Sequence, residues 1–514
     1  LALVLAANLG VAQPGGLTPT LVNGATAASG GAIVRLSADG RTVLSVTRVA
    51  AQVTDLALDG ADNILVAAGT GGVLKLTPTA GSVVWARLGG SYVHRLDADA
   101  TGACAALVPG NVADADGAAG AGRITVLSAD GSLAAELAGY HNTQDLCLDA
   151  ASRTLITVGW RQANAFDGTR TEPVQIAYLR GHGYDGTVKW TNYDWSADRA
   201  SPRFLNRPEN NMADTRGYRC SMGRDGKLYA AFECAGGNHM FRYSPTDITR
   251  RESIVGGDQF HTFSNTRAEH KTFFARYEPG TGAYLRGQQL VNRLSNGQGN
   301  TIRVKGGEIW ADEEGRVYLG GASAYGLPPL TLDSPELGTY TGGAWLMVFN
   351  PTLTQRLFVT RLNAGGQTAA IDARLINGKT GLAWAGRAGL ENATRQYVLS
   401  AVQPAPGGGT QDGFFAVSGA AGVTLSAANG QGQPGLVVFP NPTAGSFTLN
   451  LPSAAPARVT IFDGLGREAA PPLARPAGSL PLHVALPAAL PAGLYHVRVQ
   501  QAGRVSTQAL QVVR

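Results

Sequence analysis

The sequence predicts an all-β protein, and three observations carry this prediction. Glycine accounts for 68 of the 514 residues, and 44% of the residues are hydrophobic while only 15% are charged. Long helical periodicities are missing, whereas short apolar runs recur between turn-forming residues. This composition favours many short strands joined by tight turns around a large buried core.

One strand–turn–strand pattern recurs along most of the chain. Each copy consists of a short apolar run, a polar turn and a second apolar run. The turns, for example at residues 59–63 and 224–227, are rich in Asp, Asn and Gly, which is typical of hairpins. The copies cover residues 53–68, 93–109, 143–159, 217–233, 307–322 and 370–385.

A second hairpin follows most of these copies and completes a four-stranded unit. At residues 81–85 and 186–190 this hairpin places Trp four residues after Gly, and versions without Trp lie near Gly131 and Gly282. Four-stranded units that repeat at about 40 residues or more are typical of the blades of a β-propeller. Residues 13–429 are therefore predicted to form a six- or seven-bladed β-propeller.

The sequence leaves the closure of the propeller open. An additional hairpin at residues 32–46, with Asp39-Gly40 at its turn, either completes the last blade or belongs to a seventh one. We expect Trp85 and Trp190 to pack as wedges between neighbouring blades. Their hairpins resemble the repeats of quinoprotein-like and SBBP-like secreted propellers. We expect no cofactor from this resemblance.

The first residues of the chain are apolar. Residues 1–12 end with small side chains before Gln13-Pro14, and we interpret them as the remnant of a secretory signal peptide. The alternative is a first β-strand. No continuous apolar run reaches the length of about 18 residues that a membrane-spanning helix needs, so we expect no membrane span.

The last part of the chain, residues 436–514, follows a linker at residues 430–435 that is rich in Gly, Gln and Pro. Short runs with alternating apolar and polar residues predict half-buried strands. Pro440 and Pro442 have no amide hydrogen and suit the edge of a sheet. The pattern predicts a small Ig-like antiparallel β-sandwich. The alternative is an accessory module that binds carbohydrate or spaces domains.

Two motifs in this segment resemble those of the type A C-terminal sorting domain of type IX secretion substrates. The motif residues are Pro440, Asn441, Pro442, Gly445, Gly493 and Tyr495. The resemblance implies export by the type IX secretion machinery of a Bacteroidota-like bacterium, so that the protein is secreted or lies on the outer-membrane surface. It also implies that the domain is removed while the cargo is attached to surface lipopolysaccharide or released.

The net charge of +5 is distributed unevenly. Residues 436–514 contain six Arg and two acidic residues, so this part carries +4 of the charge. The preceding part is nearly neutral. We expect no nucleic-acid partner, because binding a duplex requires clustered Lys and Arg.

Two long insertions, around residues 160–215 and 235–300, widen the spacing of the repeats. Long loops on a rigid scaffold are disproportionately functional. These combine aromatic, amide, carboxylate and Arg side chains, a mixture that suits sugar rings. The alternative is a solvated rim that packs on itself. The candidate ligand-binding residues are Trp195, Arg207, Glu209, Asp214, Arg216, His239, Asp258, His261, Asn265 and His270.

These observations favour a propeller that binds an extracellular ligand, expected to be a glycan, without catalysis. The alternative is a secreted polysaccharide hydrolase or lyase. A glycosidase needs two carboxylates beside the scissile bond, and the insertions supply Glu209, Asp214, Asp258 and Glu269. The sequence assigns none of them a catalytic role. No spacing of His and carboxylate residues predicts a metal site.

Four cysteines allow three full disulfide pairings, which an oxidising destination would permit. We predict the pairing of Cys104 with Cys147, on adjacent blades; buried free thiols are the alternative. A bridge from Cys220 to Cys234 is not expected, because their hairpin places residue 230 opposite Cys220. An offset of four residues along a strand, about 13 Å, is too long for a disulfide.

Overall fold

The chain divides into two compact units, Leu1–Ala427 and Ala428–Arg514. The structure is a computed structural model. It describes residues 3–8, 31–36, 43–109, 119–140, 142–166, 171–195, 214–235, 240–248, 250, 252, 270–290, 292–293, 299–323, 343–361, 367–376, 379–389, 411–423, 437–439, 441–450, 456–463, 467–476, 482–487, 490–501 and 504–513.

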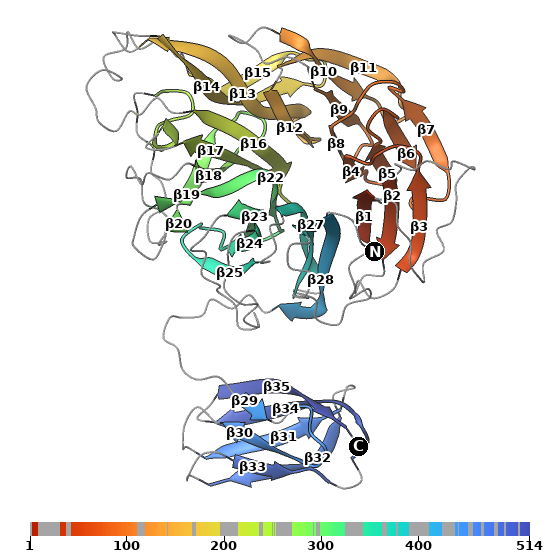
Figure 1. The fold of residues 1–514 in the computed structure, drawn as a ribbon, viewed down its shortest axis with the longest axis vertical. Helices are drawn as coiled ribbons and strands as arrows, with labels where there is room; N and C mark the ends of the chain where they lie inside the picture. Colours follow the sequence, from red (N-terminus) through yellow and green to blue (C-terminus); the bar gives the residue numbers. More distant parts are fainter. Residues whose placement is uncertain are drawn as a thin grey trace. The chain divides into compact units, whose positions relative to one another are not determined.

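The first unit begins with antiparallel sheets whose strands follow one another in chain order (Figure 1). A three-stranded sheet contains β1 (Leu3–Asn8), β2 (Gly31–Leu36) and β3 (Val43–Val49). The next two sheets have four strands each: β4 (Asp55–Leu58), β5 (Ile64–Ala67), β6 (Val73–Leu76) and β7 (Val83–Arg87), then β8 (Arg95–Ala98), β9 (Cys104–Val108), β10 (Ala119–Leu127) and β11 (Leu133–Tyr140).

Further four-stranded sheets continue this order. They contain β12 (Asn142–Asp149), β13 (Thr154–Phe166), β14 (Thr171–Gly183) and β15 (Val188–Tyr193), and then β16 (Thr215–Met222), β17 (Leu228–Ala235), β18 (His270–Tyr277) and β19 (Tyr284–Leu290). After the short pair β20 (Asn292–Arg293) and β21 (Gly299–Asn300) come β22 (Ile302–Ala311), β23 (Val317–Ser323), β24 (Gly343–Phe349) and β25 (Arg356–Arg361), and finally the three strands β26 (Gln367–Ile376), β27 (Lys379–Gly389) and β28 (Gln411–Val423).

Each predicted strand–turn–strand repeat contains parts of the first two strands of one sheet. Residues 53–68, for example, contain β4 and β5, and residues 217–233 contain most of β16 and β17. The first strands β4, β8, β12, β16, β22 and β26 lie side by side in this order (Figure 1). The predicted all-β class is confirmed. The sheets succeed one another as propeller blades do, while ring closure and blade number stay predictions.

The N-terminal segment forms a strand in the structure. Residues 3–8 pair with β2 along its whole length, which is the first-strand alternative to the signal-peptide interpretation. The predicted hairpin of β2 and β3 pairs with β1 in a sheet of its own. Among the described strands, it therefore does not complete the sheet of β26 to β28.

Part of each predicted insertion belongs to the sheets. Residues 160–215 include the end of β13 and all of β14 and β15, and residues 235–300 include β18 and β19. The spacing of the repeats widens there partly because β13 and β14 each have 13 residues.

The turns between first and second strands share a hydrogen-bond pattern. Asp59 Oδ1 accepts hydrogen bonds from the backbone N–H groups of Ala61 and Asn63, both at 2.9 Å. Asp312 makes the same two contacts in the β22–β23 turn. The carboxylate accepts hydrogen bonds from backbone N–H groups of the turn that have no partner in the sheet. This turn position therefore favours Asp. These tight turns define the short-turn face, and the connections at the opposite strand ends define the long-connection face.

Trp85 and Trp190 pack between neighbouring sheets, as predicted. The Trp85 Nε1 donates to the Ala129 carbonyl at 3.0 Å, and a Cβ added to Gly131 would lie 2.9 Å from the indole. Trp190 has the same relation to Gly282 of the next sheet. Glycine at these positions therefore makes room for a ring that buries a large apolar area.

The predicted disulfide between Cys104 and Cys147 is wrong, because all four cysteines are free and buried. Cys147 instead forms a side-chain hydrogen bond with Cys220 of the neighbouring first strand. Cys220 faces Ala230, the position that the sequence predicts opposite it. Burial raises the pKa of the Cys104 thiol to about 12, so this thiol stays protonated at neutral pH.

The second unit consists of two antiparallel sheets that enclose a common core. In β34 every second side chain, from Tyr495 to Gln501, is buried. Phe447 and Leu449 of one sheet share this core with Val497 of the other. One sheet contains β29 (Val437–Phe439), β30 (Ser446–Asn450) and β33 (Leu482–Ala485), and the other contains β32 (Glu468–Arg475), β31 (Ala457–Phe462), β34 (Gly493–Gln501) and β35 (Arg504–Val512).

The two segments that resemble a sorting signal meet at the last strand. Thr443 forms a parallel bridge with Val512, and Gly493 is the antiparallel partner of the same residue. The backbone N–H of Gln511 donates to Asn441 Oδ1 at 2.8 Å. Strand β35 thus holds together two segments that lie far apart in the sequence.

The other motif residues lie nearby in the second unit. Gly445 accepts a hydrogen bond from the Leu486 N–H at 2.8 Å through its carbonyl. The Tyr495 hydroxyl donates to the Pro491 carbonyl at 2.9 Å. Pro440 lies outside the described residues.

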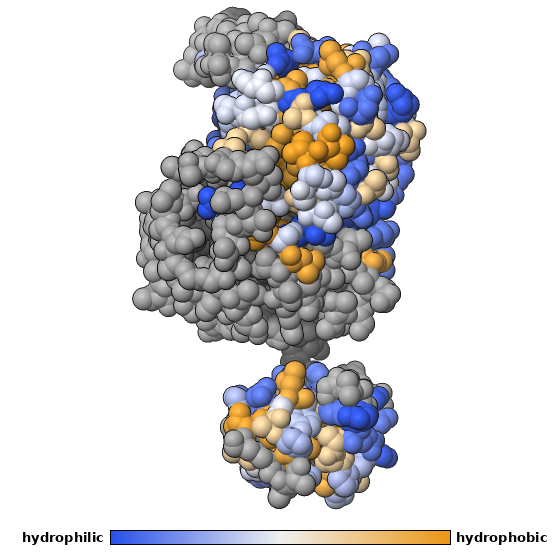
Figure 2. Space-filling model, turned by 90° about the vertical axis from the view of Figure 1, so that its right-hand side faces the viewer, coloured by the Kyte–Doolittle hydropathy of each residue, from blue (hydrophilic) through white to orange (hydrophobic). Residues whose placement is uncertain are grey.

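The surface of the first unit mixes apolar and polar side chains. Figure 2 shows small apolar groups separated by hydrophilic residues on one side of this unit. The exposed large apolar residues include Val83 and Val84 of β7. The helical element that the structure describes is the short 3-10 helix η1 (Met240–Arg242), and no described helix is long and apolar enough to cross a membrane.

Candidate functional site

Four of the predicted ligand-binding residues lie in the described part of the first unit. They are Trp195, Asp214, Arg216 and His270. The other predicted residues lie outside the described ranges: Arg207, Glu209, His239, Asp258, His261 and Asn265.

Trp195 packs into the core at the end of β15. Only 9% of its surface is exposed. Its ring lies edge-on to that of Tyr193, with the centroids 5.0 Å apart, and 6.1 Å from that of Phe241. Arg161 donates from Nη2 to the Trp195 carbonyl at 2.9 Å. Trp195 therefore supports the sheet and offers little ring surface to a ligand.

Asp214 and Arg216 form an ion pair that is mostly buried. Arg216 Nη2 lies 2.6 Å from Asp214 Oδ2, and the side chains are 19% and 31% exposed for Arg216 and Asp214. Gln175 of β14 holds both residues: its backbone N–H donates to Asp214 at 2.9 Å, and its side-chain oxygen accepts from Arg216 Nε. The structure thus brings these two predicted residues together.

His270 belongs to a buried network around Glu233. His270 Nδ1 lies 3.5 Å from Glu233 Oε2. The same carboxylate accepts from Arg303 Nη2 and from the backbone N–H groups of Val304 and Lys305, each at 3.1 Å. These donors compensate the cost of burying the charge. Arg303 is more exposed than Glu233 and His270, with 31% of its side chain accessible.

The Tyr218 hydroxyl lies close enough to Arg216 and Arg303 for both guanidinium charges to act on it, and it is hydrogen-bonded to Arg303. Burial raises the pKa of this hydroxyl to about 12, an effect that Glu233 reinforces and that Arg216 and Arg303 oppose. The Trp160 ring meets the Tyr218 ring edge-on with the centroids 5.4 Å apart. We call Trp160, Asp214, Arg216, Tyr218 and Arg303 the Tyr218 cluster. It lies toward the long-connection face, where β16 and β22 begin.

The cluster offers the chemistry that saccharides require. Guanidinium N–H groups donate to hydroxyl and carboxylate oxygens, and an indole packs on apolar ring faces. Trp160 is only partly buried and keeps some exposed surface. Among the described residues, no group of three or more His, Cys, Asp and Glu side chains could hold a metal ion.

The predicted ligand-binding residues did not include Trp160, Tyr218 and Arg303 of this cluster, or Gln175, which holds Asp214 and Arg216. All four lie within strands, and Trp160 and Gln175 belong to the part of the predicted insertion at residues 160–215 that forms β13 and β14. Their positions along the strands could have identified them, because each lies toward the same end of its sheet as Arg216.

A second group of charged residues occupies equivalent positions on five first strands. Each residue stands four positions before the start of the following turn, and the sign of the charge alternates from one sheet to the next. We call this group the inner charge row. Its members are Asp55, Arg95, Asp145, Arg219 and Glu308.

Neighbouring members of the inner charge row contact each other across the sheets. Arg95 Nη1 lies 3.8 Å from Asp55 Oδ2, and Arg95 Nε lies 4.0 Å from Asp145 Oδ1. Arg219 Nη1 lies 3.7 Å from Asp145 Oδ2, and only 3% of the Arg219 side chain is exposed. The alternation of charge allows each described contact to join opposite charges.

The carboxylates of this region also bind the backbone of the next first strand. Asp55 Oδ2 accepts from the Leu96 N–H at 3.1 Å, and Asp145 Oδ2 accepts from the Cys220 N–H at 3.2 Å. Asp97, on β8, accepts in the same way from the next sheet. The acidic side chains therefore connect adjacent sheets as well as adjacent charges.

Burial shifts the pKa values of several groups in this region. It raises the pKa of Glu308 to about 8, against the opposing effect of Arg219. It raises the pKa of Asp97 to about 7. Burial and the charges of Arg95 and Arg219 lower the pKa of His94 to about 4. At neutral pH, Glu308 is therefore mostly protonated and His94 is neutral.

Comparisons with known proteins assign the chain to no family. No family model and no curated protein matches it. Among solved structures, the chain is similar to BamB from Moraxella catarrhalis, with 13% identity, a TM-score of 0.32 and coverage of 68% of this chain and 87% of that chain. For the WD40 domain of Toxoplasma gondii coronin, the identity is 10%, the TM-score 0.35 and the coverage 74% and 83%.

Another similar structure is PorZ, a surface component of the type-IX secretion system of Porphyromonas gingivalis. The identity is 11%, the TM-score is 0.15, and the match covers 94% of this chain and 85% of that chain. Similarities at these TM-scores do not identify a function, which has to be inferred from the residues of this chain.

Proposed function

We propose that the protein is exported to the cell surface or the medium, and that its first unit is a β-propeller that binds an extracellular glycan without catalysis. The binding site is the Tyr218 cluster. One observation carries the proposal: Arg216 and Arg303 are each held by a carboxylate, and both guanidinium charges act on the same Tyr218 hydroxyl.

These side chains are held in fixed positions, which favours ligand binding. Arg216 is fixed by Asp214 and Gln175, and Arg303 by the buried Glu233. Little side-chain freedom is therefore lost when a ligand binds, which lowers the cost of association. The accessible part of Trp160 supplies an apolar surface beside these donors. The predicted residues outside the described ranges stay candidates for the same site: Arg207, Glu209, His239, Asp258, His261 and Asn265.

A glycan array probed with the full chain, followed by calorimetry on the best ligand, tests this proposal. Arg216→Gln and Trp160→Leu are each expected to weaken binding at least tenfold. Arg374→Gln is the matched control, because Arg374 also pairs with an Asp two residues away, at 2.9 Å, and its side chain is 22% exposed. Equal losses in Arg216→Gln and Arg374→Gln, or no binding to any glycan, would contradict the proposal.

We further propose that the second unit directs export through the type IX secretion machinery, with attachment to lipopolysaccharide or release afterwards. The meeting of Thr443 and Gly493 at Val512 supports this role, because one receptor could contact both motif segments at once. Removal of residues 436–514 is expected to leave the first unit in the periplasm of an expressing host that has this machinery. Detection of the truncated protein at the cell surface would exclude the sorting role.

A secreted polysaccharide hydrolase or lyase is the second candidate function. The observation that favours it is the inner charge row, where Glu308 has a pKa of about 8 and Asp145 lies close enough to influence it. A protonated carboxyl beside a second carboxylate is suited to acid–base catalysis. Turnover on a polysaccharide panel that Glu308→Gln abolishes would favour the enzyme. Glycan binding without turnover would favour the binding protein.

A further inference from the structure

Trp85 and Trp190 each occupy one place in a fourth strand, from which the indole packs against the next sheet. We call this place the wedge position, and it is not filled by Trp at every junction between sheets. In the fourth strands, Trp85 pairs with Lys75 and Trp190 pairs with Gly181, in each case directly after a register shift. The residue at the same place in the intervening sheet is Ala135. It pairs with Val126 of β10, again after a register shift. Ala135 thus stands where the sheets before and after it carry an indole.

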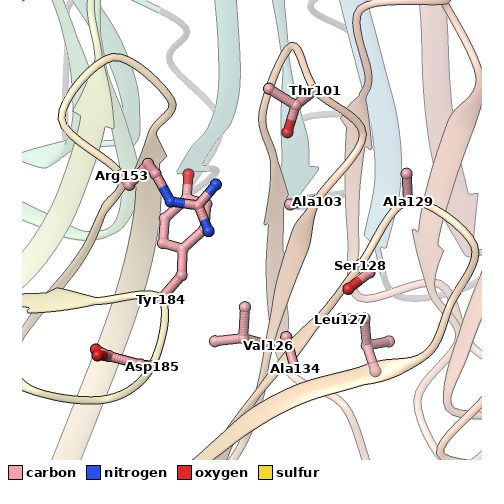
Figure 3. A pocket seen from close by; sticks show the side chains of 10 residues that line it. All are labelled: Thr101, Ala103, Val126, Leu127, Ser128, Ala129, Ala134, Arg153, Tyr184 and Asp185. Carbon is pink, nitrogen blue, oxygen red and sulfur yellow. The ribbon is translucent and has the colours of Figure 1, made fainter.

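A cavity of about 310 Å³ lies at this junction on the short-turn face (Figure 3). One wall comes from the sheet of β8 to β11 and the other from the sheet of β12 to β15. Two of its lining residues have counterparts beside Trp85. Val126 pairs with Ala135 as Lys75 pairs with Trp85. Tyr184 has the same turn position as Ala129. The cavity therefore lies beside the place that a wedge would take, and Ala135 itself is not among the residues that line it. The remaining lining residues are Thr101, Ala103, Leu127, Ser128, Ala129, Ala134, Arg153 and Asp185.

Neighbouring side chains replace the missing Trp only in part. Leu137, two residues beyond Ala135, lies 3.3 Å from a Cβ added to Gly186. The buried Tyr184 ring closes the opposite side, and its hydroxyl donates to Asp99 Oδ2 at 2.6 Å. The remaining space opens to solvent between exposed residues such as Arg153.

The polar groups of the cavity match an aromatic ring that carries a hydrogen-bond donor. In the occupied junctions, the indole N–H of Trp85 donates to the Ala129 carbonyl, and that of Trp190 donates to the Pro279 carbonyl at 2.9 Å. The equivalent carbonyl at the empty position is that of Tyr184, as judged by the hydrogen bonds of the three turns.

Arg153 adds a second feature that favours an aromatic ligand. Its guanidinium lies 5.1 Å from the centre of the Tyr184 ring, and Figure 3 shows the two side chains together on one wall of the cavity. A guanidinium can stack on a further ring from its other face. A cavity of this volume is at the lower end of the range of small-ligand sites, which suits a single ring system.

We propose that this cavity is a docking site for one aromatic side chain of a partner protein, with tryptophan as the best-fitting residue. The inference rests on the equivalent occupied junctions and does not depend on glycan binding, because the Tyr218 cluster lies toward the opposite strand ends. The partner ring would enter between Val126 and the Arg153–Tyr184 wall and donate its N–H to the Tyr184 carbonyl.

Titration of the full-length protein with N-acetyl-tryptophanamide, followed by saturation-transfer NMR, tests the proposal. The wild type is expected to bind in a saturable manner in the millimolar range (about 1 mM), as is usual for a single small ring. Ala135→Trp introduces an indole at the wedge position next to the cavity and is expected to weaken binding at least tenfold. Leu133→Trp is the control, because Leu133 lies on the same strand but is 64% exposed.

A second variant keeps the test decisive if Ala135→Trp does not fold. Arg153→Ala removes one wall of the cavity from an exposed position and is expected to weaken binding at least threefold. N-acetyl-leucinamide is expected to bind more weakly than the aromatic probe. The proposal is overturned if the wild type shows no saturable binding, if the folded Ala135→Trp variant binds as the wild type does, or if both probes bind equally.

Discussion

The indole of Trp85 lies against Gly131 of the next sheet, so that an added Cβ would come within 2.9 Å of the ring. Gly131 also has a φ of +80°, a conformation that side-chained residues rarely adopt. Gly131→Ala therefore combines backbone strain with displacement of a packed ring. We expect it to lower the free energy of unfolding by about 3 kcal/mol or more, measured by urea denaturation.

Gly226→Ala separates these two effects. Gly226 has a φ of +73°, but no heavy atom lies within 4 Å of an added Cβ. This variant should lower the free energy of unfolding only through backbone strain, by about 1 to 2 kcal/mol. If both substitutions cost the same, the close packing of Trp85 on Gly131 contributes nothing.

In the inner charge row, the side chain of Arg219 is less exposed than those of Asp55, Arg95 and Asp145. It contacts Asp145 and donates from Nε to the Gly307 carbonyl. Arg219→Met removes one partner and leaves Asp145 buried with less compensation, so we expect a loss of about 3 to 5 kcal/mol in unfolding free energy. Lys227→Met is the comparison: the Lys227–Glu278 pair, at 2.7 Å, is half-exposed and should contribute less than about 1 kcal/mol.

The inner charge row was open to prediction from the sequence, and the Tyr218 cluster was not. Alignment of the repeats on their turns places a charged residue four positions before Asp59, Asp149 and Asp312 alike. That regularity is local in the sequence. In contrast, Trp160 and Arg303 come from strands of different sheets, and no spacing in the sequence shows that they approach the same Tyr218.

The strands themselves followed from local chemistry. Asp at the start of the turns and alternating burial in the strands are short-range features, and they located the first hairpin of six sheets. The disulfide prediction failed because local sequence does not show which residues of neighbouring sheets come into register. Cys147 lies against Cys220 and not Cys104, which depends on how adjacent first strands are aligned.

The titration of Glu308 predicts a pH dependence of stability. The pKa of this group is raised from 4.5 to about 8 in the folded protein, so the folded state holds the proton more tightly than the unfolded chain. Its contribution to stability is complete below pH 4.5 and is lost as the pH rises through about 8. Glu308→Gln cannot ionise and should avoid this loss.

Melting temperatures of the wild type and Glu308→Gln between pH 5 and pH 9 provide the measurement. We expect the difference to grow in favour of Glu308→Gln as the pH rises. His94 does not produce the same trend, because its lowered pKa of about 4 gives stability that is lost as the pH falls. A constant difference across this pH range would show that Glu308 has an ordinary pKa.

The four buried thiols give a prediction about redox state. Burial raises the pKa values of Cys147 and Cys220, so few thiolates are available for reaction in the native protein. A thiol reagent should modify almost no cysteine under native conditions and all four in denaturant without prior reduction. Each disulfide would remove two of these reactive groups. Because Cys147 and Cys220 are hydrogen-bonded neighbours, a bridge between them in oxidised samples is the specific result that would contradict the free-thiol state.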